Sequence, residues 1–399
     1  MGMGTMRPRL ILHPGKEKPL RQRHPWLFSG AIARAEGRPG PGQVVEVMAA
    51  DGGWLAWAEF NPISQIRARA FAWEQEQVVD AAFWRQRLAA SIERRRQLLP
   101  DREAVRLVFA ESDGLPGLIV DHYGPHLVLQ SLTAGAEARK AQTIAHLVEL
   151  LHPASIVERD DPVRQKEGLP RAGGTVWGTR PDEPVVITEN GLRFFVDLVG
   201  GQKTGFFLDQ AANRQVLAPY CAGAEVLNAF SYTGAFAVAA LAAGARHVTN
   251  LDSSAEALAL AAQNLALNGF SPDQWTHIEA DAFQQLRRWR DEGRQFDLII
   301  LDPPKFATSP AQVERAARGY KDINWLAFRL LRPGGLLATF SCSGAVGRDL
   351  FQKIVFGAAL DAGREARIVT HFSQSPDHPV LLSFPEGAYL KGLLCQVGK

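Results

Sequence analysis

Residues 225–236 read EVLNAFSYTGAF, a short apolar strand pattern that runs into a turn and then into a helical pattern. Strand-like and helix-like stretches continue to alternate downstream, and two strands are almost entirely apolar: DLIILD at 297–302 and LLATFS at 336–341. This alternation is typical of an α/β fold with a Rossmann-like, doubly wound parallel sheet. Because ligands of such sheets bind at the carboxyl ends of the strands, we expect the functional residues there.

The residues before this sheet divide into two further regions. Residues 1–75 carry short strand patterns separated by Gly and Pro, which predict a β-rich domain. Residues 76–183 mix strand and helix patterns, which indicates a middle α+β domain, and its last part, 159–183, is charged and rich in Gly and Pro and is expected to be loop. The third domain, 184–399, opens with two strand patterns around Asn190–Gly191, a strong hairpin signal.

Composition narrows the class of protein. The chain is 46% hydrophobic and 22% charged, which is ordinary for a globular protein, and no apolar run approaches the length of a membrane span. Its three cysteines are too few and too scattered for a disulfide framework or a zinc site. We therefore expect a cytoplasmic protein with neither a bound metal nor a membrane partner.

The charge is unevenly distributed along the chain. The net charge is +2, but residues 1–38 contain eight Lys or Arg against two Glu, a local charge of +6. A basic surface of this kind favours binding to a nucleic-acid backbone, and Lys16, Arg21 and Arg23 are the candidate RNA contacts. A solvated surface that aids solubility is the alternative, and the charge pattern alone favours neither.

The turn after the strand at 225–228 bears on the cofactor. A dinucleotide needs three glycines in the pattern G-x-G-x-x-G, so that a pyrophosphate can approach the backbone. This turn has one glycine among larger residues, so it favours a cofactor without phosphates, of which S-adenosyl-L-methionine is the common one. The candidate contacts in the turn are Asn228, Phe230, Ser231, Tyr232, Thr233 and Gly234.

Acidic residues end the next two strands. Asp252 can accept hydrogen bonds from both hydroxyls of a ribose, while Asp281 and the N–H of Ala282 can bind an adenine ring. Each Asp can instead cap the helix that follows it. Their occurrence at consecutive strand ends, beside a turn unsuited to phosphate, favours the cofactor site.

The fourth and fifth strands end in LDPPKF, residues 301–306, and ATFSCSG, residues 338–344. Cys342 is the candidate nucleophile, because a thiolate added to C6 of cytosine makes C5 reactive toward a methyl donor. Asp302 is the candidate donor of a proton to ring N3 and a further cofactor contact. A lone Cys is more often a small buried residue, but a strand end among Ser and Gly argues against that here. The candidate RNA contacts in the proline loop are Pro303, Pro304, Lys305 and Phe306.

The loop GGQKTGFFLDQ, residues 200–210, precedes the first strand of the sheet. Lys203 is a candidate contact of the methionine carboxylate or of an RNA phosphate, and Asp209 is a candidate cofactor contact. In the alternative interpretation, Phe206 and Phe207 belong to the core and Asp209 caps a helix.

Several segments together resemble the RlmI-like bacterial 23S ribosomal RNA cytosine-5 methyltransferases over essentially the whole chain. They are HPWLFSGAI, SDGLPGLIVDHYG, GQKTGFFLDQ, LNAFSYTGAFAV, DPPKF, GYKDIN, TFSCSG, HPV and FPEGAYLKG. The resemblance implies an N-terminal PUA RNA-binding domain, a middle domain and a C-terminal Rossmann-like methyltransferase domain. It also implies 23S ribosomal RNA as partner, a possible homodimer, and Cys342 in the place of the catalytic cysteine. The proline loop holds Lys305 and no second cysteine, in agreement with this family, so no base for the C5 proton is assigned.

Two other functions compete with this interpretation. A D-P-P loop also serves enzymes that methylate the amino group of guanine (N2) or adenine (N6), but these usually carry an aromatic directly after the prolines, where this chain has Lys305. A non-catalytic RNA-binding assembly factor with a retained methyltransferase fold is the second alternative, and failure to bind S-adenosylmethionine would favour it.

Overall fold

The computed structural model describes residues 7–201 and 204–398, which divide into two units. Among these residues, unit 1 comprises 7–185, 196–201, 204–208 and 377–387, and unit 2 comprises the remainder. Two segments that are distant in sequence from the N-terminal part therefore pack with it. No helix among the described residues is long and apolar enough to cross a membrane.

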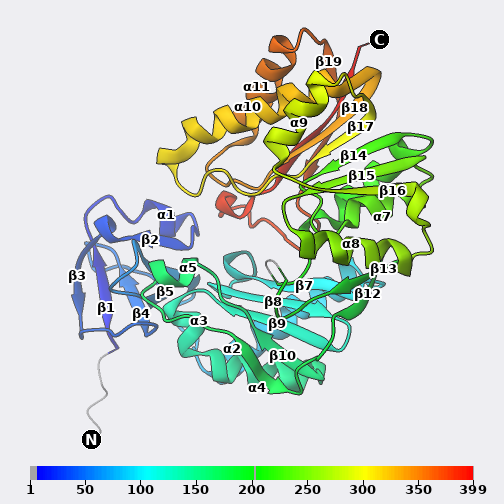
Figure 1. The fold of residues 1–399 in the computed structure, drawn as a ribbon. Coiled ribbons are helices and arrows are strands. Elements are labelled where there is room, and N and C mark those ends of the chain that lie inside the picture. Colours follow the sequence, from blue (N-terminus) through cyan, green and yellow to red (C-terminus); the bar gives the residue numbers. More distant parts are fainter. Residues whose placement is uncertain (1–6, 202–203, 399) are drawn as a thin grey trace, which may run out of the picture. The chain divides into compact units, whose positions relative to one another are not determined.

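The N-terminal part of unit 1 is a six-stranded sheet (Figure 1). Its strand order is β2-β6-β5-β4-β1-β3. Leu10, Val45 and Ala58 are fully buried in its core. The strands and the short helix beside them are β1 (Arg9–Leu12), α1 (Lys18–Arg21), β2 (Trp26–Phe28), β3 (Ile32–Glu36), β4 (Val44–Met48), β5 (Trp54–Phe60) and β6 (Ile66–Ala72). The β-rich prediction for this region is confirmed.

Unit 1 also contains a five-stranded sheet of order β11-β10-β9-β8-β7. Its elements are α2 (Ala81–Leu98), β7 (Ala104–Phe109), β8 (Leu118–Tyr123), β9 (His126–Ser131), α3 (Ala134–Ala138), α4 (Lys140–Leu151), β10 (Ser155–Glu158), α5 (Val163–Lys166) and β11 (Gly174–Gly178). The expectation that residues 159–183 are all loop is wrong, because α5 and β11 lie there. Tertiary contacts explain the difference: β11 pairs with β10, and the buried Arg164 donates to the carbonyl of Ser131 and to Glu137.

The predicted hairpin is confirmed as β12 (Val185–Glu189) and β13 (Leu192–Val196). Asn190 and Gly191 have φ of 51° and 79°, the left-handed values that a two-residue turn of this type requires. Glu189 at the end of β12 accepts two hydrogen bonds of 2.7 Å from Arg214, and both side chains are buried. This ion pair joins the hairpin to the helix α6 (Ala211–Leu217).

Unit 2 contains a seven-stranded sheet of order β16-β15-β14-β17-β18-β20-β19 (Figure 1). β14 to β18 are parallel to one another, and β20 pairs antiparallel with both β18 and β19. The strands are β14 (Glu225–Ala229), β15 (His247–Asp252), β16 (Trp275–Glu279), β17 (Phe296–Leu301), β18 (Leu331–Ser341), β19 (Ala366–Ser373) and β20 (Lys391–Val397). The predicted α/β doubly wound fold is confirmed.

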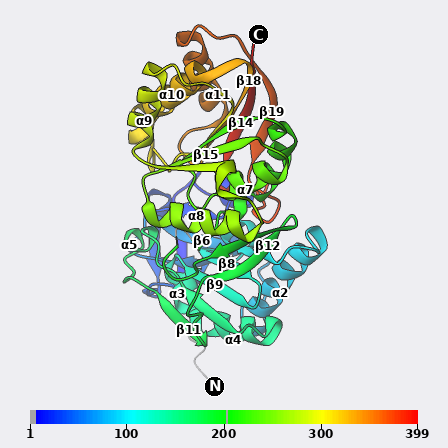
Figure 2. The same cartoon turned by 45° about the vertical axis from the view of Figure 1, so that its right-hand side comes forward.

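Helices pack in two groups against this sheet. One group is α6, α7 (Ala235–Ala242) and α8 (Ala255–Leu267); the other, seen together in Figure 2, is α9 (Ala282–Asp291), α10 (Val313–Leu330) and α11 (Arg348–Asp361). Residues 298–301 of β17 have no exposed surface. Since the middle strands are covered in this way, polar groups become accessible only at the strand ends. The order of the strands changes direction between the parallel neighbours β14 and β17, which is where such sheets bind ligands.

We predict that Arg214→Met lowers the free energy of unfolding by about 3–5 kcal/mol, because it leaves Glu189 buried without its bidentate partner. Lys353→Met is the matched control, since Lys353 and Asp349 form an exposed pair on α11 and its loss should cost less than about 0.5 kcal/mol. Urea denaturation followed by circular dichroism measures both, and equal midpoints would contradict the structural role of the buried pair.

Candidate active site

The turn after β14 has an unusual backbone. Phe230, Tyr232 and Gly234 have φ of 60°, 47° and 76°, so two bulky residues adopt the left-handed conformation that favours glycine. The carboxylate of Asp252 accepts a hydrogen bond of 2.8 Å from the N–H of Tyr232 and one of 3.0 Å from the N–H of Ser254. Asp252 therefore fixes the turn, in addition to its expected contact with a ribose.

The other candidate cofactor residues flank this turn. Asn228 is buried within β14 and donates to Asn250 (2.9 Å). Asp281 is exposed and caps α9 by accepting from the N–H of Gln284 (2.9 Å), while Ala282 is buried in the first turn of that helix. The capping alternative is thus observed for Asp281. A carboxylate has lone pairs beyond the one used in a cap, so its adenine contact stays a prediction.

Asp302 directly follows β17, beside the turn after β14. Gln210 donates to its Oδ2 atom (3.0 Å), and Gln210 in turn accepts from Asn213 (2.6 Å). Gln210 and Asn213 are both buried. This relay of amides fixes the rotation of the Asp302 carboxyl group before any substrate binds.

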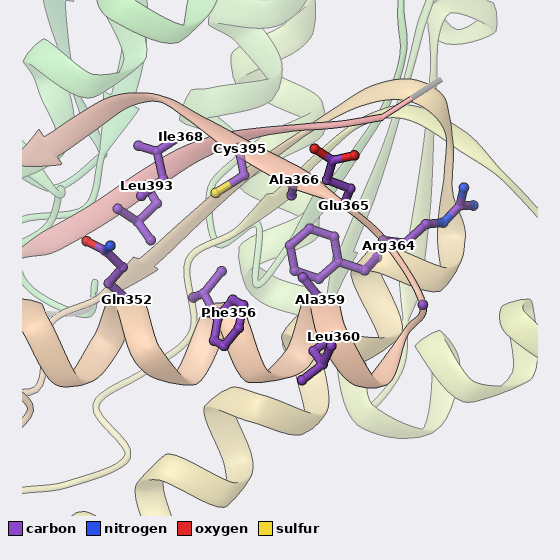
Figure 3. Close-up of a pocket in the computed structure, with 13 residues that line it drawn as sticks. Gln352, Phe356, Ala359, Leu360, Arg364, Glu365, Ala366, Ile368, Leu393 and Cys395 are labelled. Carbon is purple, nitrogen blue, oxygen red and sulfur yellow. The ribbon is translucent and has the colours of Figure 1, made fainter.

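Cys342 directly follows β18, the neighbour of β17, and its side chain is partly exposed. Cys221 and Cys395 are 1% and 3% exposed, and burial raises the pKa of each thiol to about 12. Figure 3 shows Cys395 in a pocket of about 580 Å³ between α11, β19 and β20, among apolar side chains such as Leu393 and Ile368. Of the three thiols, Cys342 is therefore the one suited to nucleophilic chemistry.

Tyr320 on α10 links the two loops that carry Asp302 and Cys342. Its fully buried hydroxyl accepts from Ser341 (2.9 Å) and lies 3.0 Å from the hydroxyl of Ser343. Ser343 also accepts from the N–H of Ala307 in the proline loop (3.1 Å). Burial raises the pKa of Tyr320, with a smaller effect from Cys342, so the phenol stays neutral and can act as a hydrogen-bonding hub.

The residues of the proline loop differ in exposure. Pro303 is buried, Pro304 and Lys305 are exposed, and Phe306 is partly buried. The ring of Phe306 packs against Tyr320 and Phe283, with centroid distances of 4.6 and 6.0 Å. Packing on two helices holds this ring in place, and the RNA contacts of the loop stay a prediction.

Only some of the candidate residues in the loop at 200–210 are described by the structure. Lys203 lies outside the described residues. Asp209 is buried and accepts from the hydroxyl of Tyr389 (2.5 Å), while Phe206 is buried as its alternative interpretation expected. In unit 1, Lys16, Arg21 and Arg23 are all exposed.

Comparison with known sequences identifies the family. Residues 139–394 match the S-adenosylmethionine-dependent methyltransferase family and residues 10–73 match a PUA-like domain. The chain is 47% identical over 394 residues to ribosomal RNA large subunit methyltransferase I of Klebsiella pneumoniae strain 342, covering 98% of both chains. The enzyme of the same name from Aeromonas salmonicida is 50% identical over 389 residues, covering 96% of this chain and 98% of that one. The chain belongs to this methyltransferase family. The resemblance deduced from the sequence motifs is confirmed.

Solved structures agree in fold. A candidate SAM-dependent methyltransferase from Streptococcus mutans superposes with a TM-score of 0.85 at 22% identity, covering 98% of this chain and 100% of that one. A second structure, described as a methyltransferase complexed with SAH, gives a TM-score of 0.86 with the same identity and coverage.

S-adenosylmethionine is the cofactor of this family, and the turn after β14 is suited to it. The hydroxyls of Ser231 and Thr233 are buried in that turn and have no hydrogen-bond partner within the described ranges 7–201 and 204–398. Buried donors in this state favour a bound polar ligand. A phosphate would need a glycine-lined backbone approach, which the side chains of Phe230 and Tyr232 do not offer. Across the same ranges, no group of three His, Cys, Asp or Glu side chains is arranged to hold a metal.

Sequence reasoning missed the residues that hold the reactive groups in place. Gln210, Asn213 and Tyr320 carried no assigned role, although Tyr320 lies in the quoted segment GYKDIN and Gln210 ends GGQKTGFFLDQ. Gln210 contacts Asp302 across 92 residues of sequence, and Tyr320 contacts Ser341 and Ser343 across 21 and 23, so no local spacing could reveal these contacts. Asn213 acquires its role only through its neighbour Gln210.

We predict that Tyr320→Phe lowers the free energy of unfolding by about 1–3 kcal/mol, because the hydroxyls of Ser341 and Ser343 lose a buried partner. Methyl transfer should fall as well, since the loop that carries Cys342 becomes less ordered. Tyr220→Phe is the matched control, because that ring is 39% exposed. Thermal unfolding and methylation assays compare the two, and an unaffected Tyr320→Phe protein would exclude the hub role.

Proposed function

We propose that this chain methylates C5 of a cytosine in 23S ribosomal RNA through a covalent adduct between Cys342 and C6. The names of its curated relatives support the RNA of the large ribosomal subunit as substrate. The observation that carries the mechanism is the position of Cys342: a partly exposed thiol at the end of β18, one strand from Asp302, in a chain whose other two thiols are buried.

The chemistry follows from these two side chains. The thiolate of Cys342 adds to C6 while Asp302 gives a proton to N3, so the double bond shifts to C4 and C5 and makes C5 nucleophilic. S-adenosylmethionine, when bound, supplies the methyl group that C5 takes. Loss of the C5 proton then restores the double bond between C5 and C6 and expels the thiolate, and N3 returns its proton to Asp302.

The surrounding residues lower the activation barrier of this reaction by holding the reacting side chains in place. Gln210 and Asn213 orient Asp302, and Tyr320 with its two serines orders the loop of Cys342. The residues proposed to hold the cofactor lie in the turn after β14 and at the ends of the next two strands. They are Asn228, Phe230, Ser231, Tyr232, Thr233, Gly234, Asp252, Asp281 and Ala282. Positioning of this kind can lower a barrier by several kcal/mol because reacting groups need no further ordering.

The RNA is proposed to bind through exposed basic residues of the PUA-like region. Lys16 follows β1, and Arg21 and Arg23 end α1 and the turn after it, so all three can reach phosphates. Extrusion of a paired base costs a few kcal/mol, which favours a cytosine in single-stranded or distorted RNA.

We predict that Cys342→Ala lowers methyl transfer by at least roughly a thousandfold while binding of SAH is retained. Asp302→Asn should lower kcat by roughly 10² to 10⁴. Cys395→Ala, a buried thiol away from the strand end, should keep activity and is the control. Mass-spectrometric mapping of 23S RNA from a complemented deletion strain identifies the product.

Three results would contradict the proposal. Retained activity of Cys342→Ala would exclude the covalent route. A missing modification on guanine or adenine would indicate amino-group methylation, and absence of any S-adenosylmethionine binding by calorimetry would indicate an assembly factor.

We further predict that the triple variant Lys16→Ala, Arg21→Ala, Arg23→Ala weakens RNA binding and reduces the slope of log K against log salt by about 2–3, because up to three phosphate contacts are lost. Lys353→Ala, which removes an exposed positive charge from α11, serves as control. Fluorescence anisotropy with a 23S fragment at several salt concentrations measures the slope. An unchanged slope would mean that this basic surface only aids solubility.

A further inference from the structure

Lys391 is a buried lysine at the end of the sheet that carries Cys342. It begins β20 and is 4% exposed. It pairs with Ser341 on β18 on one side and with Ser373 on β19 on the other. Lysines are rarely buried to this extent unless a partner offsets the loss of hydration, so its surroundings indicate what it does.

The ammonium group holds the loop that follows β18. Its Nζ atom donates to the carbonyl oxygens of Ser343 (2.6 Å) and Val346 (2.7 Å). Ser343 is the neighbour of Cys342 in the chain, and Val346 is fully buried. An ammonium has three N–H donors, so these two bonds leave one for a further acceptor in this part of the site.

The charged and titratable groups around Lys391 act on its pKa in different directions. Burial lowers the pKa of Lys391 to about 8, and Cys342 is the neighbour that opposes this by favouring the charged lysine. Arg348 at the start of α11 and Lys305 in the proline loop lower the pKa of Lys391 further. Tyr320 on α10 stays neutral, so it gives the thiolate no charge. Because electrostatic coupling is reciprocal, the charge on Lys391 must favour the thiolate of Cys342.

We infer that Lys391 is a positioning residue whose ammonium group stabilises the thiolate of Cys342 and orders the loop that carries it. The inference rests on the proposed role of Cys342 as nucleophile. Lys391 is then the group that makes the thiol of Cys342 reactive near neutral pH. Lys391 belongs to the segment FPEGAYLKG, which ends in Lys391–Gly392, so this segment contributes a residue to the site. Addition of the thiolate to C6 neutralises sulfur, and the same ammonium then stabilises the thiolate when it is expelled.

The experiment measures alkylation of Cys342 by iodoacetamide in the full-length protein between pH 5.5 and 10, with Cys342→Ala as background. The central variants are Lys391→Gln, which keeps N–H donors but has no charge, and Lys391→Arg, which keeps both. At pH 7 we expect alkylation to fall on the order of tenfold in Lys391→Gln and to stay within about threefold in Lys391→Arg. An unchanged pH profile in Lys391→Gln would overturn the inference.

A second comparison applies if Lys391→Gln does not fold. Wild-type Lys391 loses its charge near pH 8, whereas arginine keeps its charge throughout the range, so wild type should depart from a single titration curve near pH 8 and Lys391→Arg should not. Identical profiles would again overturn the inference. Alkylation needs neither RNA nor cofactor, so this result is separate from the test of the proposed function, whose covalent route fails if Cys342→Ala still transfers methyl groups.

Discussion

Parallel pairing of β14, β17 and β18 is the constraint from which the rest of unit 2 follows. Each of these strands has a neighbour on both sides, and helices pack against both faces, so their side chains must be apolar or paired with one another. Residues 298–301 meet this requirement with aliphatic side chains, and Asn228 on β14 meets it by donating a hydrogen bond to Asn250 on β15. Polar side chains that could contact a ligand therefore lie at the strand ends. Asp252, Asp302 and Cys342 are each partly exposed at or just after the last residue of a strand.

Placement at a strand end brings the reactive groups close in space but leaves them on loops, which are less ordered than strands. Buried polar groups from helices restore that order. Tyr320 joins the loop of Cys342 to the proline loop, and the amides of Gln210 and Asn213 hold Asp302. Each of these groups would cost about 1–3 kcal/mol if left unpaired in the interior, so the network favours one arrangement of the loops over all others.

Features that depend on local sequence were predicted well. The apolar runs of β17 and β18, the β-rich character of residues 1–75, and the turn at Asn190–Gly191 all follow from periodicity or turn chemistry. Features that depend on distant partners were missed. The strand β11 forms because β10 lies beside it, and β19 and β20 pair with each other at the edge of the sheet although other elements separate them in sequence from the earlier strands. Gln210 acquires its role from Asp302, a residue 92 positions away. The motifs supplied Asp302 and Cys342 as candidate reactive residues, but the groups that hold these two side chains are visible only in three dimensions.

Asp252 fixes the turn after β14 and is also the side chain proposed to bind a ribose. Left-handed φ values at Phe230 and Tyr232 each cost on the order of 1–3 kcal/mol, which glycine would avoid. Glycine would also remove the two rings, and with them the bulk that makes the turn unsuited to phosphate. The hydrogen bond from the N–H of Tyr232 to Asp252 offsets part of this strain, and the bond from Ser254 fixes the second oxygen of the same carboxylate. A carboxylate oriented by two backbone donors presents its remaining lone pairs in fixed directions, which is what recognition of a ribose diol requires. Because β14 and β15 are adjacent in the sheet, the strained turn that follows one strand and the carboxylate that ends the other stabilise each other's conformation.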